Sequence, residues 1–536
     1  MRRPLRRIGR LLFPIGLSFF CLVYGFFFAL TAPYLLIPFV IPILILVLLS
    51  IWALPDAPHA PLRAVEFCFA AVLISRVLWP NYLALELPGL PWITMLRLFG
   101  FPMAFLLLIS LSTSANFRSE IHQSLRATPG LLTCVIGLAI MNFLTIPLSE
   151  HPASSLQLAL LDLIYMVGMI VIGAWIARTP GRGARYIELL LMMAVPIMLI
   201  TIVETRMQGV LWNGHVPSFL KVNDPAAIRA LSDTTRGTTG EYRAKATFTT
   251  PLGLAEYLAV LTPFFIHKAF RARTAIVRIL SALALPVSFF CIIATNARLG
   301  VVGFLVSVLL YLLFWGLTRF ARDRRDIIGA AVVYGYPALS IAVLTAVLSI
   351  HRFRMMVLGG GEQASSNEAR QSQLTMGIPK ILQNPIGHGV GESGNAMGYA
   401  AGDFITVDNY YLTVSLDNGF AGLALFLAIF LTSIIASIRT LMKHPDLVRD
   451  EEISLLLPIA VSFSAFLVIK SVFSQTDSHM LLFALVGIST GLLYRARGVI
   501  AQSAISEAEA SASHDRGRSI RKGLRQRLST AGTVRG

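Results

Sequence analysis

Charged side chains are scarce in this sequence. They make up 14% of the 536 residues, whereas a soluble domain of this length carries roughly 25%. Hydrophobic residues make up 55%, and apolar runs long enough to cross a hydrocarbon core of roughly 30 Å recur along the chain. Because lipid offers no hydrogen-bond partner to an open backbone, such runs must be helical. The composition excludes a soluble globular domain and predicts an all-α polytopic membrane protein.

Cysteine is also rare. The four cysteines, Cys21, Cys68, Cys134 and Cys291, all lie inside apolar runs and show neither metal-ligand spacing nor a disulfide framework. We interpret them as small core residues.

About fourteen transmembrane spans are expected between residues 11 and 494. They are 11–32, 34–54, 63–79, 92–113, 129–148, 155–177, 186–205, 251–267, 276–295, 298–318, 327–350, 411–438, 453–473 and 477–494. Residues 1–10 carry five arginines and resemble the first part of a signal peptide, but the run that follows is too long and lacks a cleavage site. We expect an uncleaved first helix, a basic cytoplasmic N-terminus and a basic, disordered cytoplasmic tail over residues 495–536.

Lysine and arginine are almost absent from alternate loops. The short loops 80–91, 149–154 and 474–476 contain none, whereas the loops between them are basic. This is the asymmetry of a membrane protein with both termini in the cytoplasm. It also accounts for most of the net charge of +17, so nucleic acid is not an expected partner.

Two long outer loops break that asymmetry. Residues 206–250 carry Arg229, Arg236, Arg243 and Lys245, and residues 351–410 carry Arg352, Arg354, Arg370 and Lys380. Cations on the outer face suggest that an anionic group is bound there. The second loop, between the expected eleventh and twelfth helices, contains a pattern typical of a helix over residues 367–382, with a capping box before it and Asn384-Pro385 after it.

No ionisable residue lies in the middle of an expected span. Those inside spans cluster near the outer ends: Arg76, Arg97, Asp162, Glu204, Glu256, Arg298, Asp417 and Lys470. Each could simply extend to the membrane surface, or the group could mark a site. A coupled transporter would place ionisable groups at the midplane, so the pattern favours an enzyme that works at the outer leaflet.

Several short segments around the two outer loops are familiar in their order. They are Arg243–Leu258 (RAKATFTTPLGLAEYL), Ala294–Gly300 (ATNARLG), Arg370 in the loop helix, Asn384–Gly391 (NPIGHGVG), Asp408–Leu412 (DNYYL) and Asp417–Gly422 (DNGFAG). Together, over roughly residues 240–440, they resemble the O-antigen ligase and Wzy polymerase superfamily of bacterial envelope glycosyltransferases.

The resemblance implies a GT-C-like fold and a transfer reaction at the periplasmic face of the bacterial inner membrane. The donor would be a glycan on undecaprenyl pyrophosphate, with no metal or other cofactor. The acceptor would be a second lipid-linked repeat in a polymerase, or lipid A-core in a ligase. Membrane lipid and a chain-length regulator protein are the further partners to expect. A lipid-linked glycan transporter or a membrane scaffold is the alternative from another class.

The chemistry of such a donor suggests roles for three arginines. A pyrophosphate leaving group needs cations where charge develops, and the guanidinium fork matches phosphate oxygens. We therefore assign Arg243, Arg298 and Arg370 to the pyrophosphate. The acceptor hydroxyl needs a base. Asp408 could be that base or could cap the next helix, and His388 is the other candidate.

The remaining expected substrate contacts are Lys245, Asn409, Tyr410 and Asp417. Gly389 and Gly391 could let backbone approach a phosphate or could be ordinary turn glycines, and Tyr410 could stack on a sugar or belong to an interfacial aromatic belt. The sequence departs from the ligases at two points. Ligases commonly carry His before the Asn of the motif that we match to Asp408-Asn409, and Glu at the position of Asp417. The missing His favours a polymerase over a ligase.

Overall fold

A computed structural model describes most of the chain. It covers residues 36–57, 60–85, 93–217, 219–221, 240–350, 364–401, 404–405 and 407–532, and the single residues 228, 231 and 354. The expected span 11–32 and the loop cations Arg229, Arg236 and Arg352 lie outside the described residues.

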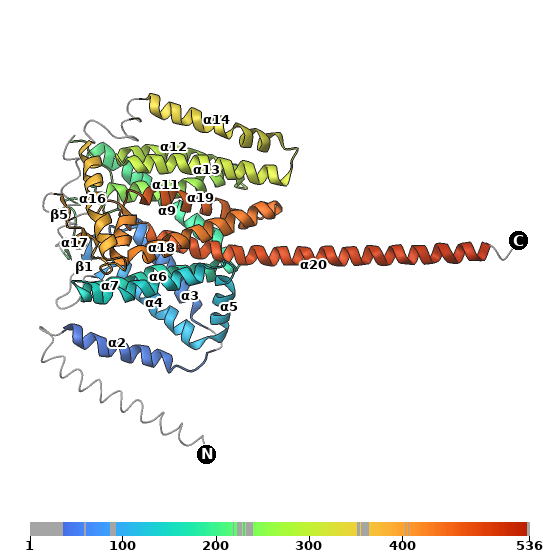
Figure 1. The fold of residues 1–536 in the computed structure, drawn as a ribbon, viewed down its shortest axis with the longest axis horizontal. Helices are drawn as coiled ribbons and strands as arrows, with labels where there is room; N and C mark the ends of the chain where they lie inside the picture. Colours follow the sequence, from blue (N-terminus) through green and yellow to red (C-terminus); the bar gives the residue numbers. More distant parts are fainter. Residues whose placement is uncertain are drawn as a thin grey trace, which may run out of the picture.

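The chain forms a bundle of long helices (Figure 1). The helices of the first half are α2 (Leu36–Trp52), α3 (Leu62–Leu78), α4 (Met95–Thr113), α5 (Ala115–Leu125), α6 (Leu131–Leu144), α7 (Pro152–Asp162), α8 (Met169–Arg178) and α9 (Arg182–Met207). A 3-10 turn, η1 (Ile146–Leu148), follows α6, and a π-helical segment, η2 (Leu163–Gly168), joins α7 to α8.

The second half contains the long loop helix and the longest spans. Its helices are α11 (Pro251–Arg271), α12 (Ala275–Ala294), α13 (Arg298–Arg322), α14 (Ile327–Ser349), α16 (Ala364–Gln383), α17 (Ser393–Met397), α18 (Tyr410–Lys443), α19 (Leu456–Lys470) and α20 (His479–Gly532). Two 3-10 turns, η4 (Pro445–Arg449) and η5 (Ile453–Leu455), connect α18 to α19.

Local sequence explains where many of these helices begin. Thr94, Ser114, Thr250, Thr274, Asp326 and Asn409 each accept a hydrogen bond from a first-turn N–H with the side chain, which is the usual role of a residue at this position. The expected loop helix is confirmed as α16. It extends three residues further toward the N-terminus than the expected 367–382, and it ends directly before Asn384-Pro385.

Ten helical segments in the described chain are long and apolar enough to cross a membrane. The protein is therefore a multi-pass, nearly all-helical membrane protein. The expected count of fourteen is not confirmed. The spans expected at 34–54, 63–79 and 251–267 coincide with α2, α3 and α11, which are not among those ten.

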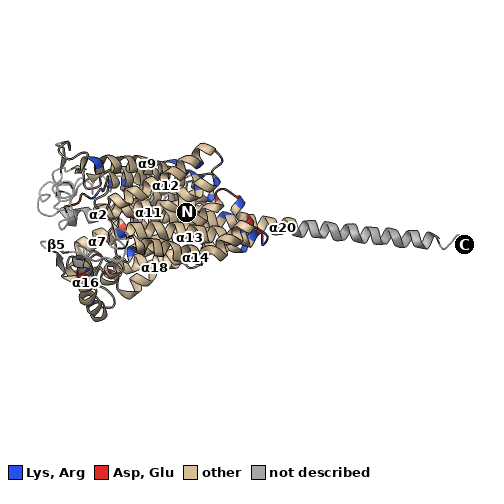
Figure 2. Cartoon of the chain, turned by 90° about the horizontal axis from the view of Figure 1, so that it is seen from above, with Lys and Arg blue, Asp and Glu red and all other residues tan. Residues whose placement is uncertain are grey.

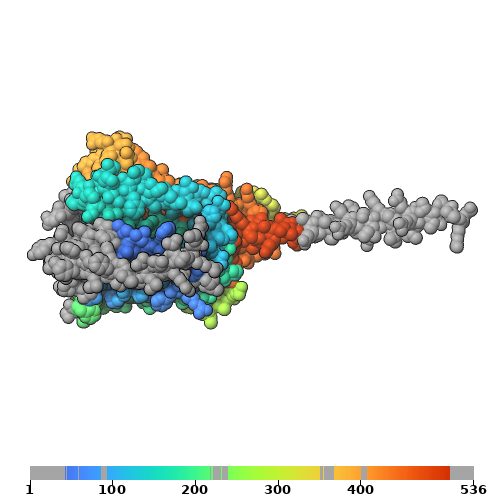
Figure 3. Space-filling view, turned by 90° about the horizontal axis from the view of Figure 1, so that it is seen from below, coloured from blue at the N-terminus to red at the C-terminus, as the bar shows by residue number. Residues whose placement is uncertain are grey.

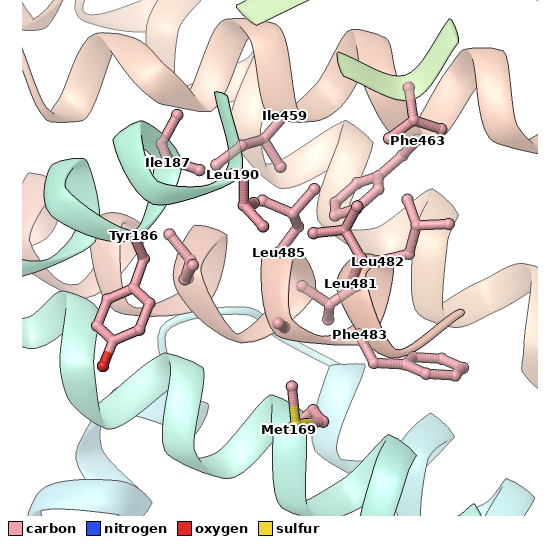
Figure 4. Packing of buried hydrophobic residues seen from close by; sticks show 14 of the residues in the cluster. Met169, Tyr186, Ile187, Leu190, Ile459, Phe463, Leu481, Leu482, Phe483 and Leu485 are labelled. Carbon is pink, nitrogen blue, oxygen red and sulfur yellow. The ribbon is translucent and has the colours of Figure 1, made fainter. Parts of the chain in front are cut away.

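The centre of the bundle is built from α8, α9, α19 and α20. Figure 4 shows Met169 of α8, Leu190 of α9, Phe463 of α19 and Leu485 of α20 directed into one core. Helices α8 and α20 approach each other so closely that an added Cβ at Gly173 would lie 2.7 Å from the carbonyl oxygen of Ala484. Glycine at such a crossing lets two membrane helices pack backbone to backbone.

The C-terminal tail differs from the expectation of disorder. Helix α20 continues without a break from the bundle to Gly532 (Figure 1). Alanine, arginine, glutamate and glutamine are good helix formers, so a segment with few large apolar residues can still extend a helix that the core has already nucleated.

Small strands and loops cover the end of the bundle where α11 and α13 begin, which we call the site end. Strands β1 (Ala84–Leu85), β2 (Ile93–Thr94) and β3 (Leu220–Lys221) form an antiparallel sheet in the order β2-β1-β3, with Ala84 opposite Thr94 and Lys221. Strands β4 (Ala400–Ala401) and β5 (Phe404–Ile405) pair in the loop that leads to α18. In Figure 3 the teal residues near 150 lie beside the yellow-to-orange residues of this loop.

Lysine and arginine lie mainly toward the two ends of the helices (Figure 2). Several of the charged groups inside spans near the site end have partners within the bundle. The clearest pair is Glu256 with Lys470, whose charged atoms lie 2.8 Å apart and whose side chains are 1% and 0% exposed. Arg76 pairs with Asp477, and Asn142 donates to Asp162 over 3.0 Å.

Candidate active site

Three arginines and one aspartate from four separate segments line a single cavity of about 190 Å³ at the site end. They are Arg243, Arg298, Arg370 and Asp408. Leu252, Asn296, Ala297, Leu299, Val472, Phe473 and Gln475 complete the wall. The four residues that sequence reasoning assigned to catalysis are thus brought together by the fold.

Arg243 lies on an extended segment before α11 that a buried carboxylate holds in place. Glu204, 1% exposed near the end of α9, accepts hydrogen bonds from the Tyr242 hydroxyl at 2.5 Å, the Lys245 N–H at 3.2 Å and the Ala246 N–H at 2.6 Å. Ala246 has a φ of 48°, a conformation that non-glycine residues rarely adopt. Glu204 therefore stabilises a tight turn that directs the neighbouring arginine toward the cavity.

The Arg243 side chain is also held in place by a hydrogen bond of its own. Its Nε donates to the Thr295 carbonyl oxygen over 2.9 Å, and the Ala244 N–H donates to the Ala294 carbonyl oxygen over 3.1 Å. Since Ala294 and Thr295 form the end of α12, the segment before α11 is joined to the turn that leads into α13.

Arg298 is the first residue of α13. The turn before it is tight, because Asn296 has a φ of 50° and the Thr295 hydroxyl accepts from the Ala297 N–H over 3.2 Å. Arg298 Nη1 donates to Asn367 Oδ1 of α16 over 3.1 Å. This contact connects the bundle to the loop helix on which the third arginine lies.

Arg370 and Asp408 come from the long outer loop. Arg370 lies on α16, and its Nε is 4.0 Å from Asp408 Oδ2. The Asp408 N–H donates to Gln373 Oε1, one turn along α16, over 2.9 Å. A small apolar cluster of Ile381, Met397, Val407, Leu412 and Leu416 packs α16 against the start of α18, so the loop is an ordered part of the site.

The structure also separates the two roles considered for Asp408. Asn409, not Asp408, caps α18, because its Oδ1 accepts from the N–H groups of Tyr411 and Leu412 at 2.9 and 3.4 Å. The Asp408 carboxylate instead lines the cavity. Asn409, expected to contact substrate, has a structural role here.

Other expected contacts lie away from this cavity wall. Lys245, two residues after Arg243 in the same segment, is 2% exposed. Tyr410 lies between Lys470, whose Nζ is 5.2 Å from its ring centroid, and His479, whose Nδ1 is 3.5 Å from its hydroxyl. Asp417 accepts from the Ser393 N–H over 2.7 Å. These groups contribute to the protein interior beside the site.

The glycine run docks onto a break in α18. Gly419 interrupts that helix with a φ of 67°, and the His388 N–H and Nδ1 both lie within 3.0 Å of the Leu416 carbonyl oxygen. Gly389 has a φ of 107°, and a Cβ there would lie 2.6 Å from the Ser149 Cβ. Gly391 also has a positive φ, with Leu158 occupying the space that a Cβ would need. Close packing and turn geometry, as in the alternative reading, account for both glycines.

Sequence reasoning did not select Asn296 or Gln475 as cavity residues. Asn296 stood within the quoted ATNARLG segment, but nothing marked its amide as site-directed. Gln475 lies in the cation-free loop 474–476, and its carbonyl oxygen accepts from the buried Lys470 ammonium. Only the folded chain places Gln475 beside the arginines.

One further group in the described chain has metal-ligand character. Ligand atoms of Glu150, His151 and Glu392 all lie within 4.8 Å of one another. Glu392 Oε1 already accepts from the Ser149 hydroxyl and from the His151 N–H at 2.8 and 3.0 Å, and Glu150 and His151 are exposed. The carboxylate is satisfied by protein donors, and we assign no metal to the group.

The electrostatics of the cavity suit an anion. Its lining side chains carry three positive charges and one negative charge. A bound anion would be attracted by all three cations. Guanidinium groups from separate segments can also present several forks to one phosphate group.

A comparison with known families matches part of the chain. Residues 280–427 match the family model Wzy_C, described as O-Antigen ligase. The segment contains Arg298, Arg370 and Asp408, and Arg243 lies before it. The match confirms the resemblance to the O-antigen ligase and Wzy superfamily and supports a glycosyltransferase-like enzyme. A search of the curated proteins found no match.

Proposed function

We propose that this protein is a polysaccharide polymerase of the bacterial inner membrane. It transfers a glycan from undecaprenyl pyrophosphate to the sugar hydroxyl of a second lipid-linked repeat, at the periplasmic face, within a GT-C-like fold. The observation that carries the proposal is the convergence of Arg243, Arg298, Arg370 and Asp408 on one cavity.

The cavity has a volume of about 190 Å³ and carries its three arginines on the wall, and a pyrophosphate is smaller than a sugar repeat. The phosphates would lie among the arginines, while the glycan and the lipid tail would extend out of the cavity.

In the proposed reaction the acceptor hydroxyl attacks the anomeric carbon, and the bond from that carbon to the phosphate oxygen breaks. The electron pair leaves with undecaprenyl pyrophosphate, whose developing charge the three arginines stabilise. The acceptor proton passes to the Asp408 carboxylate, which can act as the general base. Arg370, which would bind the leaving group, and Asp408, which would act as the base, are neighbouring side chains.

The description of the matched family favours a second candidate, an O-antigen ligase that transfers the glycan to lipid A-core. Both candidates would use the donor cavity in the same way and differ in the acceptor. The departure at Asp408, where ligases commonly carry His, supports the polymerase.

The test compares the size of the surface glycan with the size of the lipid-linked precursor in a deletion strain. Single repeats that accumulate on the lipid, and disappear on complementation, would support a polymerase. Full-length polymer retained on the lipid carrier would instead identify a ligase. A deletion strain in which lipid-linked repeats remain on the cytoplasmic side would refute both readings and favour a transporter.

A further inference from the structure

A second arginine-lined cavity lies at the opposite ends of α11 and α13. It has a volume of about 420 Å³ and is lined by Phe270, Arg271, Trp315, Thr318, Arg319, Arg322, Pro445 and Val448. Both helices begin at the first cavity and end at this one. Their 21 and 25 residues correspond to lengths of about 32 and 37 Å, close to the roughly 30 Å of a hydrocarbon core. The two cavities therefore lie about one bilayer thickness apart.

The arginines of this second cavity come from two helices and converge. Arg271 donates to the Val448 carbonyl oxygen of η4. Arg319 pairs with Asp326 and lies 5.4 Å from the centroid of the Trp315 ring. The like charge of Arg322 acts on Arg271. The residues that line the cavity include no acid, and the nearby acids, Asp326 at Arg319 and Glu451 near Arg271, lie outside the lining. An anion between the arginines would therefore add a favourable contact with all three cations.

One wall of the cavity is aromatic and faces outward. The Phe270 ring stacks on Trp315, with centroids 5.5 Å apart and planes 18° apart, and Phe270 is 51% exposed. On a membrane helix an exposed apolar side chain meets lipid. The cavity thus offers cations at its rim and apolar surface beside them, which matches a molecule with an anionic head and a hydrocarbon tail.

Basic residues at helix ends have a simpler explanation, since cations there complement the helix dipole and follow the positive-inside rule. That explanation covers Arg324 and Arg325, which are exposed in the turn after α13. It does not explain why three arginines line one cavity beside the stacked rings of Phe270 and Trp315.

We propose that this cavity binds the phosphate of an anionic phospholipid in the leaflet opposite the active site. Basic pockets between membrane helices commonly hold such head groups. The lipid phosphate would lie between Arg271, Arg319 and Arg322, and an acyl chain would lie along Phe270. Because α11 and α13 connect the two cavities, the bound lipid would set the depth of both helices in the bilayer.

The full-length protein is purified in a neutral detergent, and lipid binding is measured by native mass spectrometry. The probes are phosphatidylglycerol, phosphatidylethanolamine and water-soluble glycerol phosphate. Arg322→Gln is the main variant because its side chain is exposed and its loss leaves the core intact. Arg325→Gln makes the same charge change three residues away, outside the cavity lining, and Arg322→Lys keeps the charge.

We expect wild type to prefer phosphatidylglycerol over phosphatidylethanolamine. Arg322→Gln should raise the Kd for phosphatidylglycerol about fivefold, because this is the effect expected from the loss of one contact between a basic residue and an anionic lipid. Arg325→Gln should change it less than about twofold, and Arg322→Lys should recover part of the loss.

Three results would overturn the proposal. They are equal losses in Arg322→Gln and Arg325→Gln, equal binding of the two phospholipids, and competition by glycerol phosphate as strong as that by the lipid. The last result would indicate a site for a soluble phosphate compound. The assay measures binding and not transfer, so its failure would leave the proposed enzymatic function untouched.

Discussion

Replacement of Arg370 by Gln separates catalysis from stability. Its Nε is 4.0 Å from Asp408, and the two side chains are 30% and 37% exposed. A long ion pair between partly exposed side chains contributes about 1 kcal/mol or less to stability, and Gln places a polar group at the position of the buried Arg370 Nε, so the variant should fold and reach the membrane. The loss of one group that stabilises developing charge, in contrast, typically costs about 10²- to 10³-fold in rate.

The assay is transfer of glycan between lipid-linked repeats by purified protein, alongside thermal stability in detergent. Arg206→Gln is the matched control. Arg206 is an exposed arginine in the last turn of α9, at the site end, and it does not line the cavity. Arg370→Lys should fall between wild type and Arg370→Gln, because lysine keeps the charge but not the fork. A rate for Arg370→Gln within about threefold of wild type, or an equal loss in Arg206→Gln, would refute the assigned role.

Three further predictions concern groups that hold the site in place. Glu204→Gln replaces one of the two oxygens that serve three donors with an NH2 group that cannot accept, so transfer should fall together with thermal stability because the turn beside Arg243 loses part of its support; unchanged melting and transfer would contradict this. Glu256→Gln leaves Lys470 as a buried charge and should destabilise the protein by about 3–5 kcal/mol, with most of the loss recovered when Lys470→Met is added; melting curves of the single and double variants decide it. At Glu392, burial alone would raise the carboxyl pKa, but hydrogen bonds from Asn395, Ser149 and His151 outweigh it and hold the pKa below its usual value. A carboxyl whose pKa is lower in the folded state stabilises the protein at pH values above its unfolded pKa of about 4.3. This stabilisation is lost as the pH falls through the folded pKa. Stability measured from pH 7 to pH 3 should therefore fall less steeply at the acid end in Glu392→Gln, and parallel curves would argue against it.

Hydropathy predicted the helices well because a membrane span depends mainly on local composition. Expected spans such as 186–205 and 298–318 correspond to α9 and α13 within a few residues at most ends. The end of the loop helix α16 was also predictable, since the Asn384-Pro385 stop is a local signal. The expected capping box did not mark its start, because Ser365 and Glu368 lie inside α16, which begins at Ala364. The helical tail was not, because its composition permits either disorder or the extension of an existing helix.

The three arginines could be selected from sequence through motif order and through the chemistry of a pyrophosphate donor. Their convergence could not, because it depends on long-range contacts. Glu204 reaches the segment before α11, Thr295 binds Arg243, and Asn367 binds Arg298. The roles of Asn409 and of Gly389 were likewise undecided until a helix start and the Ser149 side chain were in position.

By itself the sequence determined that the chain is a multi-pass helical protein, where most helices begin and end, and which cations lie beside the large outer loop. These properties follow from hydropathy, capping and charge, which act over a few residues. The tertiary structure decided which of those cations share a cavity, and that Asp408 lines this cavity while Asn409 caps α18. It also decided that a second arginine-lined cavity lies at the C-terminal ends of α11 and α13. Those outcomes depend on how helices distant in sequence pack, and no local pattern encodes them.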